Sequence, residues 1–68
     1  MKYSYDQLNR IANSMSFGAY GSFANHIGDA FLVADTSNRE ILFKAFEGLF
    51  DKVANISGIK PTIDEAAQ

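Results

Sequence analysis

The stretch SNREILFKAFEGLFDKVANI, residues 37–56, carries the longest helical periodicity in the chain. A capping-box spacing at its start, Ser37 followed by Glu40, and Gly58 with Pro61 beyond its end are typical start and stop signals of a helix. The stretch therefore predicts one long α-helix. Its apolar residues recur at intervals of four and three, which places them on one side of such a helix, and they are Leu42, Phe46, Leu49, Val53 and Ile56.

Two shorter helices are predicted before it. Ser4 and Gln7 have the spacing of a second capping box, and apolar residues then repeat at helical intervals, which predicts a helix over 4–16. Gly18 is suited to end that helix.

Ser22 is suited to begin the next helix, predicted over 22–35. Gly28 lies in the middle of this helix at a cost of about 1 kcal/mol relative to Ala. We therefore expect another backbone to cross closely at Gly28.

The predicted fold is all-α: a three-helix domain over 1–58 with the third helix at its centre, followed by an arm or tail over 59–68. The simplest interpretation of the last segment is a frayed tail. The alternative is an arm that lays Ile59 and Ile63 on a neighbouring surface. The predicted core consists of Leu8, Ile11, Met15, Phe23, Ile27, Ala30, Phe31, Leu42, Ala45, Phe46, Leu49 and Val53.

Composition excludes several functional classes. The 68 residues contain no cysteine and one histidine, so neither a disulfide framework nor a zinc site of Cys or His ligands is expected. A formal net charge of −2 offers no basic surface for nucleic acid. Apolar runs are far shorter than the ~20 residues that span a bilayer, and no signal peptide is expected. A cytoplasmic protein without a cofactor is the expectation.

No residue pattern predicts catalysis or metal binding. His26 and Asp29 are spaced to share a helix face, but a solvated His–Asp pair is the simpler interpretation. Glu47 and Asp51 share a face as well, and a metal ion would need further ligands. We therefore expect no enzyme and name no catalytic residue.

Two ligand hypotheses remain open. Helix N-termini offer a possible site for a small nucleotide or another anion. Arg39 in the first turn of the third helix, aromatics such as Tyr20 at a subunit interface, and His26 are its candidate residues. The short turn before the third helix also permits a helix-turn-helix interpretation using Asn38, Arg39 and Lys44. The apolar character of that helix makes DNA binding the weaker hypothesis.

Self-association is the strongest expectation about surfaces. The apolar arc of the third helix spans roughly 200° at ~100° per residue, about twice the stripe that a surface helix buries. Phe43 and Phe50 would lie at its edge, with Leu32 and Val33 as a second exposed apolar site. A two-fold dimer through these four residues would cover them. The competing explanation is that Ile59 and Ile63 fold over the same edge.

The pattern A-D-x-x-N-x-x-x-L-x-x-A-F resembles a segment of small accessory proteins of tailed phages and prophages. Gly21 and Phe23 precede it, as a glycine and an aromatic residue do in those proteins, and the resemblance covers 21–50. The residues of the pattern are Ala34, Asp35, Asn38, Leu42, Ala45 and Phe46.

The resemblance implies an accessory phage protein that acts in the host bacterial cytoplasm, and it carries no catalytic residues. We expect a non-enzymatic binding protein that inhibits a host protein, such as a defence protein, through protein–protein interaction. The alternatives are an oligomeric sponge for an anionic signalling molecule and a DNA-binding regulator.

Overall fold

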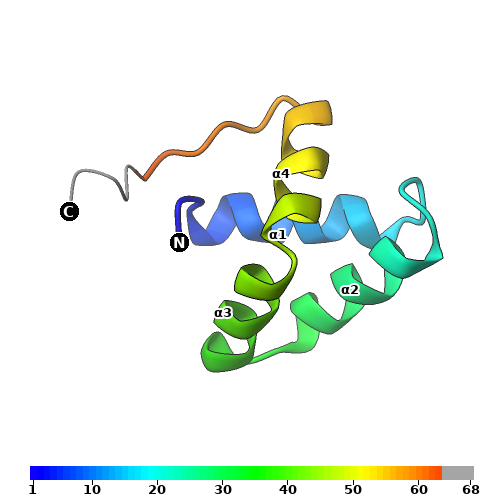
Figure 1. Cartoon of the computed structure of the whole chain (residues 1–68), viewed down its shortest axis with the longest axis horizontal. Helices are drawn as coiled ribbons and strands as arrows, with labels where there is room; N and C mark the ends of the chain where they lie inside the picture. The colour runs from blue at the N-terminus through cyan, green and yellow to red at the C-terminus, as the bar shows by residue number, and fades with distance from the viewer. Residues whose placement is uncertain (64–68) are drawn as a thin grey trace.

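A computed structural model describes residues 1–63 of the chain and contains four α-helices and no strand in that range. In chain order they are α1 (Tyr5–Ser16), α2 (Ser22–Val33), α3 (Thr36–Ala45) and α4 (Glu47–Ile56) (Figure 1). The all-α prediction is confirmed. The prediction of three helices is wrong, because the stretch over 37–56 forms two helices.

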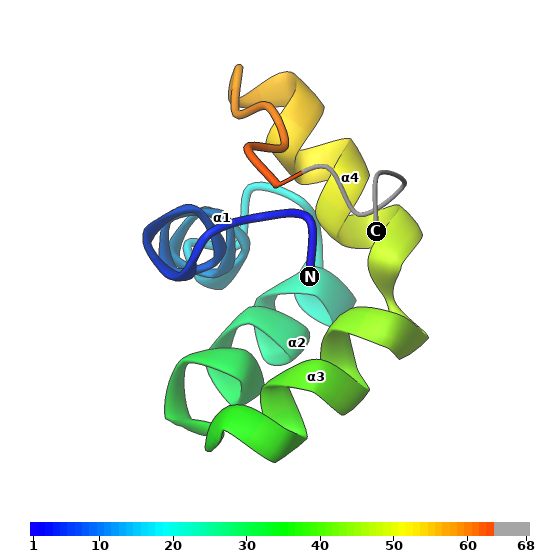
Figure 2. The ribbon, with the colours of Figure 1, turned by 90° about the vertical axis from the view of Figure 1, so that its left-hand side faces the viewer.

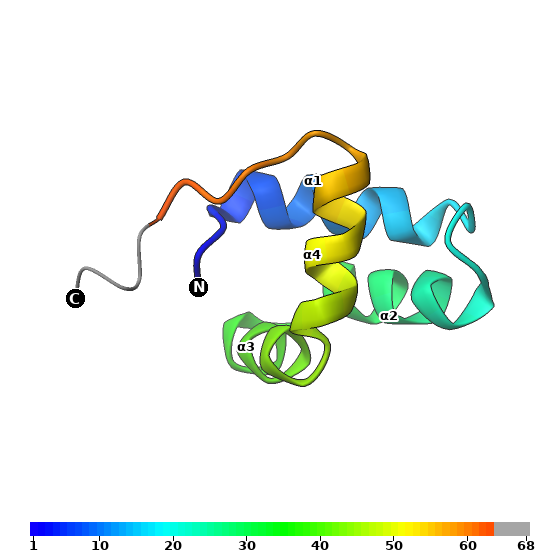
Figure 3. The same cartoon turned by 45° about the horizontal axis from the view of Figure 1, so that its top comes forward.

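The long predicted helix is interrupted at Phe46. This residue has φ −124° and ψ 30°, outside helical geometry, and it separates the end of α3 from the start of α4. Figure 3 shows α3 nearly end-on while α4 is seen along its length. The periodic pattern missed the break because it records which positions are apolar and not whether the helix axis continues.

The change of direction brings two phenylalanines into the core. Phe43 lies in α3 and is 4% exposed, and Phe50 lies in α4 and is fully buried. Burying such a side chain is worth about 1.5–3 kcal/mol. Starting a new helix leaves its first N–H groups without intrahelical partners, but Glu47 and Gly48 are exposed to water at that point. The free energy gained by burying these two side chains therefore outweighs the cost of interrupting the helix.

The crossing of α1 and α2 depends on Gly28. A Cβ atom at Gly28 would lie 2.7 Å from the Ala12 carbonyl oxygen and 2.9 Å from the Ser16 backbone nitrogen. Contacts this short are not tolerated by backbone atoms, so only glycine allows the two helices to pack at this distance. The predicted close crossing at Gly28 is confirmed.

The core is a chain of aromatic rings surrounded by aliphatic side chains. Centroid distances are 5.1 Å between Phe31 and Phe50, 5.5 Å between Phe50 and Phe43, and 6.0 Å between Phe43 and Tyr3. Such tilted and edge-on pairs add about 0.5–1.5 kcal/mol each beyond area burial. The core thus joins residues from α2, α3, α4 and the N-terminal segment.

The predicted core is correct in part. Five of its members are buried: Leu8, Ile11, Met15, Phe31 and Val53. Four are half-buried: Ile27, Leu42, Phe46 and Leu49. The prediction is wrong for Phe23, Ala30 and Ala45, which are exposed. The buried residues that it missed are Tyr3, Ala12, Ala24, Phe43, Phe50, Ala54 and Ile59.

The helix ends follow local capping chemistry. The Ser4–Gln7 capping box of α1 is confirmed, and Gly18 has the positive φ of 84° expected after that helix. The expected box at Ser37 is wrong, because Asp35 caps α3 through a 2.9 Å bond from the Asn38 N–H. The Asp35 carboxylate precedes Ser37 and already satisfies that N–H.

Gly21, at φ 94°, precedes α2, and Ser22 is already helical. Ser22 was expected to be the N-cap of this helix, so that prediction is wrong by one residue. A positive φ is readily adopted only by glycine, which explains why the chain turns into α2 at Gly21.

The segments on either side of the helices lie against each other (Figure 2). The N–H groups of Thr62 and Ile63 both donate to the Lys2 carbonyl, at 3.1 and 3.0 Å, and the Gln7 side chain donates to the Lys60 carbonyl at 2.6 Å. Ile59 is buried. A frayed tail is therefore wrong for 59–63, while residues 64–68 lie outside the described part of the chain.

No helix within residues 1–63 has the length and apolar character needed to cross a membrane.

The glycine at the α1–α2 crossing gives a matched test of this fold. Gly28→Ala gains helix propensity but forces backbone atoms apart, so we expect it to lower the free energy of unfolding by about 1–3 kcal/mol. Gly48→Ala, in α4, has no atom within 4 Å of the new Cβ and should raise it by up to about 1 kcal/mol. Urea unfolding of both variants measures the difference, and equal effects would contradict the close crossing.

Candidate functional site

The proposed dimer edge is not on the surface. Phe43 and Phe50 are core residues, so the prediction that they form an interface is wrong, and the break at Phe46 is the reason. Of the other two residues in that prediction, Leu32 is half-buried and packs against the core. Val33 is 87% exposed. The competing explanation, in which Ile59 and Ile63 fold over that edge, is correct in part, because Ile59 is buried in the core whereas Ile63 is 41% exposed.

Within one chain, the three residues named for the predicted ligand site lie apart. Tyr20 is half-buried in the turn before α2, and His26 is exposed on α2. Arg39 bonds to carbonyls at the other end of α2. A helix of 12 residues is about 18 Å long, so Tyr20 and Arg39 are separated by the length of α2.

Arg39 closes the C-terminal end of α2. Its Nε donates to the Ala34 carbonyl at 3.3 Å and its Nη2 to the Leu32 carbonyl at 3.4 Å, while Nη1 donates to Asn9 Oδ1 on α1 at 3.0 Å. The guanidinium carbon also lies 4.7 Å from the centre of the Phe31 ring. A cation is favourable at a helix C-terminus. Arg39, only 8% exposed, thus fastens α3 to α2 and α1.

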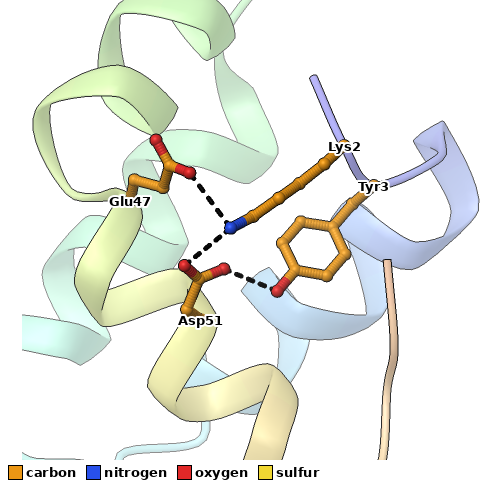
Figure 4. A network of polar contacts seen from close by, with 4 residues as sticks. All are labelled: Lys2, Tyr3, Glu47 and Asp51. Atoms are coloured by element: carbon orange, nitrogen blue, oxygen red, sulfur yellow. Dashed lines mark hydrogen bonds and ion pairs between the residues drawn. The ribbon is translucent and has the colours of Figure 1, made fainter. Parts of the chain in front are cut away.

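A polar network joins the N-terminal segment to α4 (Figure 4). Asp51 accepts a 2.8 Å bond from Lys2 Nζ and a 2.6 Å bond from the Tyr3 hydroxyl, and Glu47 lies 3.1 Å from the same ammonium. Lys2 lies 49 positions before Asp51 in the sequence, and Tyr3 lies 48 positions before it. Sequence analysis missed this network because no local pattern relates positions so far apart.

The network holds each group in its ordinary charge state. Hydrogen bonds to Asp51 and Glu47 raise the pKa of Lys2. Burial, with the bond to Asp51, raises the pKa of Tyr3 to about 12. Burial opposes ionisation of Asp51, but the bonds from Lys2 and Tyr3 outweigh it and lower its pKa. None of the three shifts moves a group toward neutral pH, where a general acid or base works best. The network therefore serves to hold the N-terminal segment against α4.

Titratable groups form no metal cluster in residues 1–63: no three His, Asp or Glu side chains gather there in a way that could hold an ion. His26 and Asp29 are both exposed. Of the three side chains in the helix-turn-helix interpretation, Arg39 is buried and hydrogen-bonded, so it does not face a groove.

The most distinctive surface feature is an incompletely buried apolar face that runs across α2, α3 and α4. Phe23 is 60% exposed, and its ring meets that of Phe46 edge-on at 5.4 Å between centroids. Figure 2 shows that the two helices α2 and α3 lie side by side. We call this surface the apolar face and define it as Phe23, Ile27, Leu42, Phe46 and Leu49.

Helical spacing places two pairs of these residues one turn apart. Ile27 follows Phe23 by one turn of α2, and the Phe46 N–H bonds to the Leu42 carbonyl at 3.0 Å, which holds these two residues one turn apart. All five residues had been assigned to the core. Periodicity identifies an apolar seam but cannot distinguish one that is buried within the chain from one that is left for a partner.

Comparisons with protein-family models, with curated proteins and with solved structures gave no match to this chain.

The role of Arg39 can be tested by a substitution that keeps its charge. Arg39→Lys retains the cation but loses the planar fork that reaches α1 and α2 together. We expect the free energy of unfolding to fall by about 1.5–3 kcal/mol, the range for hydrogen bonds to a charged group. The control is Arg10→Lys, at an exposed position of α1, which should change it by less than about 0.5 kcal/mol. Urea unfolding that ranks the two variants equally would contradict the fastening role.

Burial of Tyr3, together with its bond to Asp51, makes stability fall at alkaline pH. Because the pKa of Tyr3 is raised from 10.0 to about 12 on folding, the unfolded chain ionises first, and stability present below pH 10 is lost as the pH rises toward 12. The difference in unfolding free energy between wild type and Tyr3→Phe should shrink over that range by on the order of 2 kcal/mol. A difference that stays constant up to pH 12 would refute the raised pKa of Tyr3.

Proposed function

We propose that this chain is a non-enzymatic binding protein that acts by docking its apolar face against another protein. The observation that supports this proposal is the exposure of Phe23 beside half-buried Ile27 and Phe46. An apolar surface of this kind on a small domain is a common mark of a protein interaction site. Aromatic residues are enriched in the buried centres of such interfaces.

Exposed polar residues adjoin the face in sequence. They include His26 on α2 and Lys44 on α3. A polar rim around an apolar centre excludes water from the central contacts, where most binding energy resides. The partner that fits is a protein with an apolar groove and a polar rim.

The resemblance to phage accessory proteins suggests which proteins to test first. We propose a protein of a bacterial host as the partner and inhibition by occlusion as the mode of action. A second copy of this chain competes as a partner, because pairing two such faces would bury the same residues. The polar network and Arg39 take no part in this proposal, since both are engaged within the fold.

Phe23→Glu tests the proposal with a matched control. The Phe23 ring is mostly exposed, so the substitution should leave the circular dichroism spectrum unchanged while placing a charge in the centre of the interface, where an unpaired charge costs several kcal/mol. Phe17→Glu makes the same change at a residue that is 85% exposed and lies outside the face. Capture of a bacterial partner by the immobilised chain should be lost in the first variant and kept in the second.

Sedimentation equilibrium of the same variants separates the two kinds of partner. If the partner is a second copy, wild type and Phe17→Glu sediment above 7.5 kDa and Phe23→Glu does not. If both variants bind and sediment as wild type does, the apolar face is not the docking site.

A further inference from the structure

A cavity opens between the N-terminal ends of α1 and α3, on a different side of the fold from the apolar face. Its volume is about 200 Å³, and its wall includes Tyr3, Tyr5, Leu8, Thr36, Arg39 and Ile63. None of these belongs to the apolar face. For comparison, an apolar cavity of about 150 Å³ is large enough to bind benzene. The space therefore fits one ring-sized molecule.

The wall of this cavity carries a buried positive charge, that of Arg39, which has no carboxylate partner among residues 1–63. Arg39 bonds only to neutral acceptors, the carbonyls of Leu32 and Ala34 and the amide of Asn9. No carboxylate within residues 1–63 lies at ion-pair distance from it. A guanidinium has five N–H donors, and these bonds use three. A buried charge that is only partly compensated favours an anion nearby.

Two helix ends add to this potential. Ser4 and Tyr5, at the start of α1, and Thr36, at the start of α3, also line the cavity. Each helix presents the positive end of its dipole there, equivalent to roughly half an elementary charge, and the carboxylates of Asp6 in the first turn of α1 and Asp35 at the N-cap of α3 offset part of it. The guanidinium and the two helix ends thus act on the same space, whose remaining wall is aromatic and aliphatic.

From this juxtaposition we infer that the cavity binds a small organic anion with a carboxylate group and an apolar body of about one ring. The carboxylate pairs with the free donors of Arg39, and the body contacts Tyr3, Leu8 and Ile63. This goes beyond the proposed protein-docking function and does not depend on it. It also differs from the anion site expected from the sequence, because Tyr20 and His26 do not line this cavity.

Benzoate is the probe, and benzamide, which has the same shape without the charge, is its control. In amide-resolved NMR titrations of the full chain, benzoate should shift the amides of residues 4–5 and 36–39 saturably. Benzamide should bind at least about tenfold more weakly, because it cannot form charge-assisted bonds. Equal affinity for the two probes, shifts confined to other residues, or no saturable shift at millimolar benzoate would each overturn the inference.

A pair of variants keeps the test independent of folding. Thr36→Glu places a carboxylate on the cavity wall, where it competes with the probe, and Ser37→Glu adds the same charge one residue further along α3, outside the wall. Both lie in the first turn of α3, where acidic residues are favourable, so both should fold. Benzoate affinity should fall by about tenfold or more only in Thr36→Glu. An equal loss in both variants would show a general charge effect and overturn the site.

Discussion

The change of direction at Phe46 is the constraint on which the rest of the structure depends. A straight helix over 37–56 would place Phe43 and Phe50 two turns apart on the same edge of a long rod. With the chain turned, the rings of Phe31, Phe50, Phe43 and Tyr3 form one continuous contact. The turn also leaves Leu42, Phe46 and Leu49 at the outside of the corner, half-buried. One local interruption thus sets both the core and the apolar face.

Local chemistry made several features predictable. The Ser4–Gln7 box, the positive φ of Gly18 and the close crossing at Gly28 each follow from residues within one element or one turn. The break at Phe46 was not predictable in this way, because no proline interrupts the stretch and its apolar intervals continue across it. Gly48 was the only local hint. Where helical propensity and burial compete, packing of the whole chain decides the outcome.

The candidate sites were predictable to a smaller degree. The five residues of the apolar face were recognised as an apolar seam, yet their exposure depends on how much of it the other helices cover. Arg39 was identified as a residue of interest, but not its bonds to Ala34 and Asn9, since these need the relative positions of three helices. The Lys2–Tyr3–Asp51 network had no sequence signal. Interactions between distant positions are fixed by the fold.

The joined ends of the described chain have a consequence for how the molecule folds and opens. The bonds from Thr62 and Ile63 to Lys2 close a loop of nearly the whole chain, and the entropy cost of closing a loop grows with its length. We therefore expect these contacts to form after the local helices and the α1–α2 crossing. Interactions that form late mainly slow unfolding. The contacts between residue 2 and residues 62–63 should therefore slow unfolding and lengthen the lifetime of the folded state.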